Sequence, residues 1–204
     1  MNFNAIDRVG IEIEGGWTAQ PPGVTVGHDG SVSVPGAPIQ GEIKSLPMSR
    51  FDTVERYVLD NWPQMTHASC GLHIHISLRS QHHYACLMDK RFYDFFLARM
   101  QAFGTAHDIK NPNFWARLRG QNRFCERVWR PERQVEITYK DSVRYSQWNF
   151  CFAQHGTAEC RMLPTFKKKE LAVKAIREIL TIVEEWLEKA PEAVEVEAVE
   201  LVNE

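Results

Sequence analysis

Three segments of the chain alternate between apolar and polar positions, with the period of two residues that a half-buried β-strand requires. They are RVGIEIE at 8–14, GLHIHISL at 71–78 and HGTAECRML at 155–163. In each segment the apolar residues would face a core, and a pair of chemically reactive side chains would share the opposite face. These pairs are Glu12 with Glu14, His73 with His75, and Glu159 with Arg161.

Other segments have the spacing of amphipathic helices or of additional strands. We expect helices over residues 49–62, 84–107 and 168–190, and further strands over residues 135–139 and 144–152. Pro63 and Pro191 follow two of these helices directly and would end them. The stretch from Gly15 to Pro38 is rich in glycine and proline and predicts loops and short strands.

Strands that alternate with helices rather than with tight hairpins predict an α+β fold, with an antiparallel or mixed sheet covered by helices on one face. The uncovered face would then form a concave polar site. With 204 residues and ordinary apolar and charged fractions, the chain suits one domain, which we place at residues 1–190. The acidic tail at 191–204 is expected to be frayed or disordered.

Composition narrows the class of protein. The formal net charge of −2 shows no basic bias, so no nucleic-acid partner is expected. The five cysteines include no CxxC pair, and no leader-like segment precedes the first strand, which predicts a reduced, cytoplasmic protein. Charges interrupt every apolar stretch before the roughly 18 to 20 residues needed to cross a bilayer, so no membrane association is expected. Oligomerisation is left open.

The three reactive pairs have both structural and chemical interpretations. Glu12 and Glu14 would repel each other unless a cation, a shared proton or water relieved the repulsion, and Mg²⁺ is a natural partner for such oxygens. The two histidines have a spacing common among metal ligands but also fit structural hydrogen bonding. Glu159 and Arg161 would equally fit an ion pair. Their coincidence on three strands favours one site that combines metal ligands with a phosphate-binding arginine.

Seven short segments follow one another in the order GIEIE, DGS, GEIKSLP, CGLHIHI, RLRGQNRFC, RYSQWNF and GTAECRMLP. This succession, from about Val9 to Pro164, resembles the amidoligase family of the glutamine-synthetase-like carboxylate–amine ligases. The resemblance implies a glutamine-synthetase-type catalytic sheet, ATP as phosphoryl donor, and two or more Mg²⁺ ions, with Mn²⁺ as an alternative. It also implies an acyl-phosphate intermediate and, as substrates, the carboxylates and amines of amino acids, peptides or proteins.

The resemblance also implies roles for individual residues. The implied metal ligands are Glu12, Glu14, Glu42, His73, His75 and Glu159. The implied catalytic residues are Arg161, Glu159 and Glu42, and the residues implied to bind the nucleotide are Arg161, Arg119, Asn149 and Ser31. Asp29 and Ser31 match a DxS element of the family, and Asn122 matches a polar position of less defined role. The usual glutamate-aromatic-arginine signature has Cys160 at its centre here, and we expect that side chain to face away from the site.

Two alternatives stay open. One is a zinc-dependent hydrolase that uses Cys70, His73 and His75, although Cys70 is one residue out of register with the shared strand face. The other is a catalytically inactive, peptide-binding relative. The arginines between Arg117 and Arg133 would either bind an anionic substrate or form a solvated basic face.

Overall fold

The computed structural model describes residues 3–135 and 142–189. Its strands are β1 (Ile6–Trp17), β2 (Ile39–Lys44), β3 (Gly71–Leu78), β4 (Gln121–Asn122), β5 (Cys125–Glu126), β6 (Trp148–Cys151) and β7 (Thr157–Pro164). Its helices are α1 (Phe51–Asn61), α2 (Gln81–Leu87), α3 (Lys90–Ala106), α4 (Pro112–Leu118), α5 (Pro131–Gln134), α6 (Phe152–His155) and α7 (Lys169–Lys189), with a 3-10 turn, η1, at Ser142–Tyr145.

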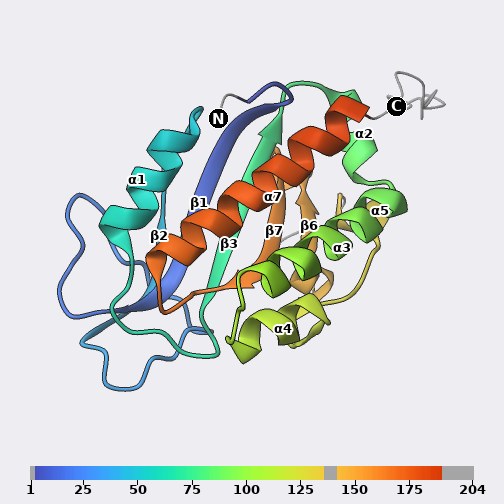
Figure 1. The fold of residues 1–204 in the computed structure, drawn as a ribbon. Coiled ribbons are helices and arrows are strands. Elements are labelled where there is room, and N and C mark those ends of the chain that lie inside the picture. The colour runs from blue at the N-terminus through green and yellow to red at the C-terminus, as the bar shows by residue number, and fades with distance from the viewer. Residues whose placement is uncertain (1–2, 136–141, 190–204) are drawn as a thin grey trace.

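A five-stranded sheet with the strand order β2-β1-β3-β7-β6 organises the molecule. Every neighbouring pair of strands in it is antiparallel, and β4 pairs with β5 in a separate small sheet. Helices α1, α3 and α7 lie together on one face, with α7 crossing the strands diagonally (Figure 1). The α+β class and the mostly antiparallel sheet are therefore confirmed.

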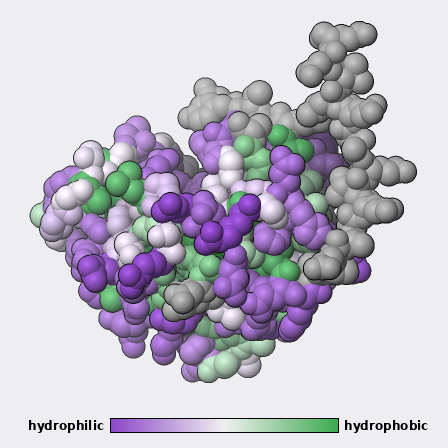
Figure 2. All heavy atoms as spheres, turned by 90° about the horizontal axis from the view of Figure 1, so that it is seen from above, coloured by the Kyte–Doolittle hydropathy of each residue, from purple (hydrophilic) through white to green (hydrophobic). Residues whose placement is uncertain are grey.

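The strands bury their apolar side chains on the helix-covered face. Ile13, Ile74, Ile76 and Met162 are all fully buried in a hydrophobic core cluster, and removing each such side chain from water contributes roughly 1.5–3 kcal/mol. The part of the surface seen in Figure 2 is mostly hydrophilic, with hydrophobic residues in small separate areas. No helix of the described residues is both long enough and apolar enough to cross a membrane.

The strands expected at 8–14, 71–78 and 155–163 are confirmed as β1, β3 and β7, and the helices expected at 49–62 and 168–190 as α1 and α7. The helical segment expected over 84–107 is confirmed. It is divided into α2 and α3, because the side chain of Asp89 accepts a hydrogen bond from the backbone N–H of Arg91 and caps a new helix.

The strand expected over 144–152 is too long. Only β6 is extended; the chain forms η1 before it and α6 after it. Gly156, with a φ of 63°, ends α6 in the left-handed conformation that glycine adopts without strain. Of the strand expected over 135–139, only Val135 is described, as the C-cap of α5. The tail at 191–204 lies outside the described residues, and the division of the chain into domain and tail stays a prediction.

Candidate active site

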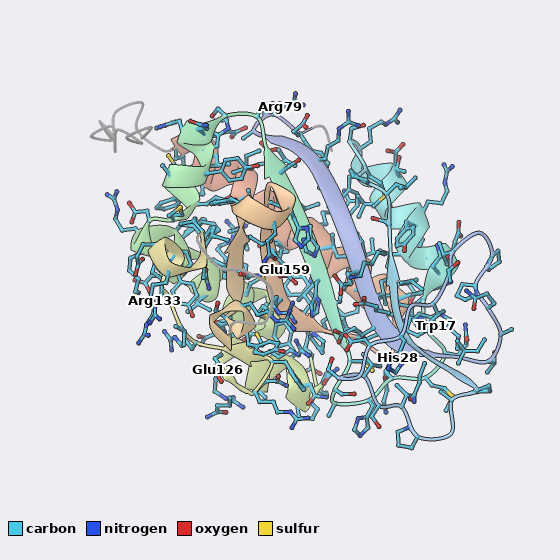
Figure 3. The ribbon with its side chains drawn as sticks, turned by 180° about the vertical axis from the view of Figure 1, so that it is seen from behind. Trp17, His28, Arg79, Glu126, Arg133 and Glu159 are labelled. Atoms are coloured by element: carbon cyan, nitrogen blue, oxygen red, sulfur yellow. The ribbon has the colours of Figure 1, made fainter. Side chains whose placement is uncertain are left out.

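The register of the sheet brings the reactive pairs together on the face away from α7. Glu12 on β1 lies directly opposite His73 on β3, and His75 lies directly opposite Glu159 on β7. Directly opposed residues in antiparallel strands have Cβ atoms only about 4.5–5.5 Å apart. Seen from behind the sheet, Glu159 lies near the middle of this face (Figure 3).

Glu12, His73 and Glu159 form a cluster that fits a metal ion. Each offers a ligand atom, and these atoms all lie within 4.8 Å of one another. Nδ1 of His73 is 3.8 Å from Oε1 of Glu12 and 3.5 Å from Oε1 of Glu159. The side chain of His73 is only 2 % exposed, and its Nδ1 has no hydrogen-bond partner among the described residues. A divalent cation held by one imidazole and two carboxylates would give this buried nitrogen a partner.

His75 adds a second imidazole beside the cluster. Its Nε2 is 3.4 Å from Oε2 of Glu12 and 3.8 Å from Oε1 of Glu159, while its Nδ1 is 3.3 Å from Oγ1 of Thr157. Burial alone would lower the pKa of His75, but hydrogen bonding to Cys151 and Glu12, together with the charge of Glu159, raises it to about 10. Without a metal, the imidazolium therefore offsets part of the carboxylate charge.

A second group of carboxylates lies towards the β2 edge, where Glu14 on β1 faces Glu42 on β2. Nζ of Lys44 is 2.8 Å from Oε1 of Glu42 and 3.7 Å from Oε1 of Glu12. Burial, followed by a hydrogen bond to Glu12 and the charge of Glu12, raises the pKa of Glu42 to about 8. Oε2 of Glu14 accepts a hydrogen bond of 2.5 Å from the backbone N–H of Gly71. In the absence of a metal, the raised pKa keeps a proton on Glu42 at neutral pH. This proton reduces the repulsion between the carboxylates, which a bound cation would otherwise relieve.

Arg161 and Asn149 fix the carboxylate of Glu159 from its other side. Nη1 of Arg161 donates to Oε1 at 2.5 Å, and Nδ2 of Asn149 donates to Oε2 at 2.8 Å. Burial raises the pKa of Glu159, but the charges of Arg161, His75 and His73 outweigh burial and lower the pKa to about 2. Glu159 is therefore ionised, and the guanidinium is held in one orientation beside it.

These side chains line one cavity of about 500 Å³, within the range typical of small-molecule sites. Its lining includes Glu12, Glu14, Glu42, His73, His75, Glu159, Arg161, Asn149, Ser31 and Asp29. The structure thus brings together all of the residues expected to bind metal. Cys160 is fully buried in the hydrophobic core, which confirms that its side chain faces away from the site. The individual roles stay predictions.

Arg119 and Asn122 are not part of this lining, and the role in nucleotide binding expected for Arg119 stays a prediction. Arg119 follows α4, and its Nε donates to Oε1 of Gln121 at the surface. Gly120, with a φ of 68°, reverses the chain after it. Arg117, two residues earlier, is fully buried instead, and its guanidinium donates to the backbone carbonyls of Arg161 and Cys70.

Cys70 lies apart from the cavity lining in a small cluster with Val32 and Val34. Burial raises the pKa of its thiol, which disfavours the thiolate that zinc binding requires. The ligand set of the zinc hydrolase alternative therefore lacks its cysteine in this arrangement.

Several residues that line the cavity were not among the site residues predicted from the sequence. Lys44 and Cys151 each stand two positions after an expected site residue, so the same-face rule for strands could have found them. The same rule could have found Tyr145 and His155, which fall at the same-face positions of the segments expected at 144–152 and 155–163, although the structure places them in η1 and α6.

Comparison of the chain with models of protein families, with curated proteins and with solved structures finds no significant match. These comparisons therefore assign no family and no activity. A function for this chain is inferred from the side chains that line the cavity and from the strands that position them.

Proposed function

We propose that the protein is an ATP- and Mg²⁺-dependent carboxylate–amine ligase with a sheet of the glutamine-synthetase type, as its resemblance to the amidoligases implies. The observation that carries this proposal is the convergence of Glu12, His73 and Glu159 with Arg161 in one cavity. Hard oxygen ligands suit Mg²⁺, and a guanidinium beside them suits phosphate. The chain has no glycine-rich phosphate-binding motif, so ATP would be held through its metal ions and arginine.

The reaction follows from the weakness of a carboxylate as an electrophile. Transfer of the γ-phosphoryl group of ATP to the substrate carboxylate gives an acyl phosphate and ADP. The amine then attacks the acyl carbon, phosphate leaves, and one proton is released as the amide or isopeptide bond forms. When bound, Mg²⁺ would neutralise charge on the phosphate oxygens.

The side chains of the cavity have distinct parts in this scheme. Glu12, His73 and Glu159 would hold a metal ion, and Asn149 would keep Glu159 oriented through its hydrogen bond of 2.8 Å. Arg161 would stabilise the charge that develops on the transferred phosphoryl group, because its planar fork is already positioned.

On the opposite wall, Glu42 would complete the metal site or, in its ionised form, accept the proton that the amine loses. Its pKa of about 8 lies near neutral pH, as proton exchange during catalysis requires. Ser31 lies in the same lining, and its hydroxyl donates to Oδ1 of Asp29 at 2.7 Å, which orders the DxS element at the edge of the cavity.

The deciding experiment is a trapping assay. The protein is incubated with ATP, Mg²⁺ and hydroxylamine against a panel of amino acids and peptides. Hydroxylamine intercepts an acyl phosphate, so a hydroxamate and ADP should form in equal amounts, without AMP. Glu159→Gln should form neither product, whereas Glu170→Gln, an exposed position on α7, should behave as the wild type.

Other outcomes would assign another function. AMP in place of ADP would indicate adenylation of the carboxylate. Peptide hydrolysis that requires zinc and ignores ATP would indicate the hydrolase alternative. Peptide binding without any turnover would indicate the inactive, peptide-binding alternative.

A further inference from the structure

The ladder between β3 and β7 contains a β-bulge within the candidate active site. The directly opposed pairs on either side of it are Leu72 with Leu163 and Ile74 with Cys160. Between these pairs one residue of β3, His73, faces two residues of β7, Arg161 and Met162. In a regular ladder Arg161 would lie directly opposite His73, where its charge would oppose metal binding. The bulge removes this direct opposition and so determines where the guanidinium of Arg161 can lie.

The backbone of Arg161 is held at this bulge through both its N–H and its carbonyl. The N–H donates to the backbone carbonyl of Gln147 at 2.9 Å, and the carbonyl accepts a hydrogen bond of 3.0 Å from Nη1 of Arg117. Nη2 of Arg117 donates to the carbonyl of Cys70, the residue before β3, at 3.4 Å. One guanidinium on α4 therefore connects the bulge of β7 to the beginning of β3.

The burial of Arg117 is energetically unfavourable. The side chain is fully buried, its Nε has no hydrogen-bond partner among the described residues, and its other donors bond to backbone carbonyls rather than to a carboxylate. Burial accordingly lowers the pKa of this guanidinium. An apolar side chain of similar length would avoid the loss of hydration, so the presence of an arginine is explained by the groups that it contacts.

Arg117 also lies behind the proposed metal ligands. A Cβ atom added to Gly71 would meet Nε2 of His73 at 2.6 Å, Oε2 of Glu14 at 3.1 Å and Nη2 of Arg117 at 3.2 Å. These three groups therefore surround the backbone of one glycine. Arg117 is not part of the cavity lining, so it can fix the strands that carry the site without occupying the space of a ligand.

We infer that Arg117 is a positioning residue of the proposed ligase. Through the carbonyl of Arg161 it fixes the bulge of β7, and thereby the direction of the Arg161 guanidinium. The inference rests on the proposed function, because that function places the guanidinium of Arg161 on the transferred phosphoryl group. Arg117 itself contacts neither the substrate nor the reacting atoms.

Arg117→Lys in the full chain tests the inference. The ammonium keeps the positive charge, but it cannot bond the carbonyls of Arg161 and Cys70 as a planar fork does. The order parameter of the Arg161 Nε–H group, measured by ¹⁵N NMR relaxation, should be about 0.85 in the wild type and below about 0.6 in the variant. The absence of this resonance in Arg161→Lys assigns it.

Turnover provides the second measurement. In the trapping assay, Arg117→Lys should lower kcat by about tenfold or more and change the KM for ATP by less than about twofold, because a misdirected guanidinium affects the transition state more than ATP binding. The control is Ile176→Ala, at a fully buried position of α7 on the other face of the sheet. It should lower the melting temperature without changing kcat or the order parameter of Arg161.

An order parameter of Arg161 that is equal in the wild type and in Arg117→Lys would overturn the inference. So would a value below about 0.6 in the wild type, an outcome that does not depend on whether the variant folds. If Arg161 loses order in Arg117→Lys but the wild type forms no ADP, Arg117 still positions Arg161 and the ligase is wrong. If both proteins form ADP at the same rate, the ligase stands and the positioning role is wrong.

Discussion

The two faces of the sheet are built from the same strands but bury different chemistry. On the face under α7, side chains such as Ile74 and Cys160 are fully buried against other apolar groups. On the opposite face, His73 is 2 % exposed and Glu159 is 4 % exposed. Buried charge is unfavourable unless it is paired, and the imidazole nitrogen of His73 shows that pairing there is incomplete. The helix-covered face is therefore packed largely from apolar side chains, whereas the open face stands to gain from a bound cation.

The largest expected effect comes from the open face. Arg161→Lys should lower the turnover of the proposed ligase by about 10³-fold, because a lysine point charge cannot replace a planar fork on the transferred phosphoryl group. ADP release at saturating ATP measures this loss. Arg99→Lys is the control, since Arg99 pairs with Glu178 and Glu185 on α7. Turnover like that of the wild type, with a lower melting temperature, would make Arg161 a structural residue.

On the helix-covered face the expected effect is on stability. Ile176 on α7 is fully buried, so Ile176→Ala should lower the free energy of unfolding by about 3 kcal/mol through lost burial and a cavity. Urea denaturation measures the change, with Leu46→Ala at the exposed position as control. Mg²⁺ affinity should stay the same. A large loss of Mg²⁺ affinity in Ile176→Ala would show that the two faces are not independent.

Magnesium should stabilise the open face alone. In EDTA-treated protein, Mg²⁺ at 100 times its Kd should raise the free energy of unfolding by about 2.7 kcal/mol. Glu159→Gln should lose this increase, whereas the exposed Glu170→Gln should keep it. Thermal melting with and without Mg²⁺ measures both. If Mg²⁺ leaves the melting temperature of the wild type unchanged, the cluster is not a magnesium site.

The smallest effect is a pH dependence of the metal-free protein. The pKa of Glu42 is raised to about 8 in the folded state, so its contribution to stability is complete below its ordinary value of 4.5 and is lost as pH rises through 8. Between pH 5 and pH 8, the EDTA-treated wild type should therefore lose more stability than Glu42→Gln. The pKa of Glu159, lowered to about 2, adds no change in that window. Parallel urea midpoints for the two proteins would contradict a protonated Glu42.

The sequence predicts which side chains share one face of a strand, but it does not predict which residues of the adjacent strand they lie opposite. Alternation placed Glu12 and His73 on the polar sides of two separate segments, because side-chain direction in a strand depends only on position. Their direct opposition depends on register, which is set by core packing across the whole chain. Which residues of the two segments lie opposite each other is therefore known only from the fold.

The alternation of apolar and polar positions also gives wrong predictions where polar side chains are buried. Gln147 was assigned to a strand, yet it precedes β6 as a fully buried residue whose Nε2 donates to the carbonyls of Arg117 and Leu118. Arg117 and Arg119 look alike in the sequence, but only Arg117 points inward. Hydrogen bonds to backbone groups decide such positions, and the identities of the residues do not reveal them.

The order of the strands also affects when the site forms. Pairing of β1 with β3 brings together residues 63 positions apart, and pairing of β3 with β7 brings together residues 82 positions apart. Such long loops lose entropy before their contacts form, which delays these pairings during folding. The proposed metal ligands therefore converge only once β7 has been synthesised and has joined the centre of the sheet. On a ribosome, the growing chain would have no metal site until nearly the last helix emerged, so metal capture would mark the completed fold.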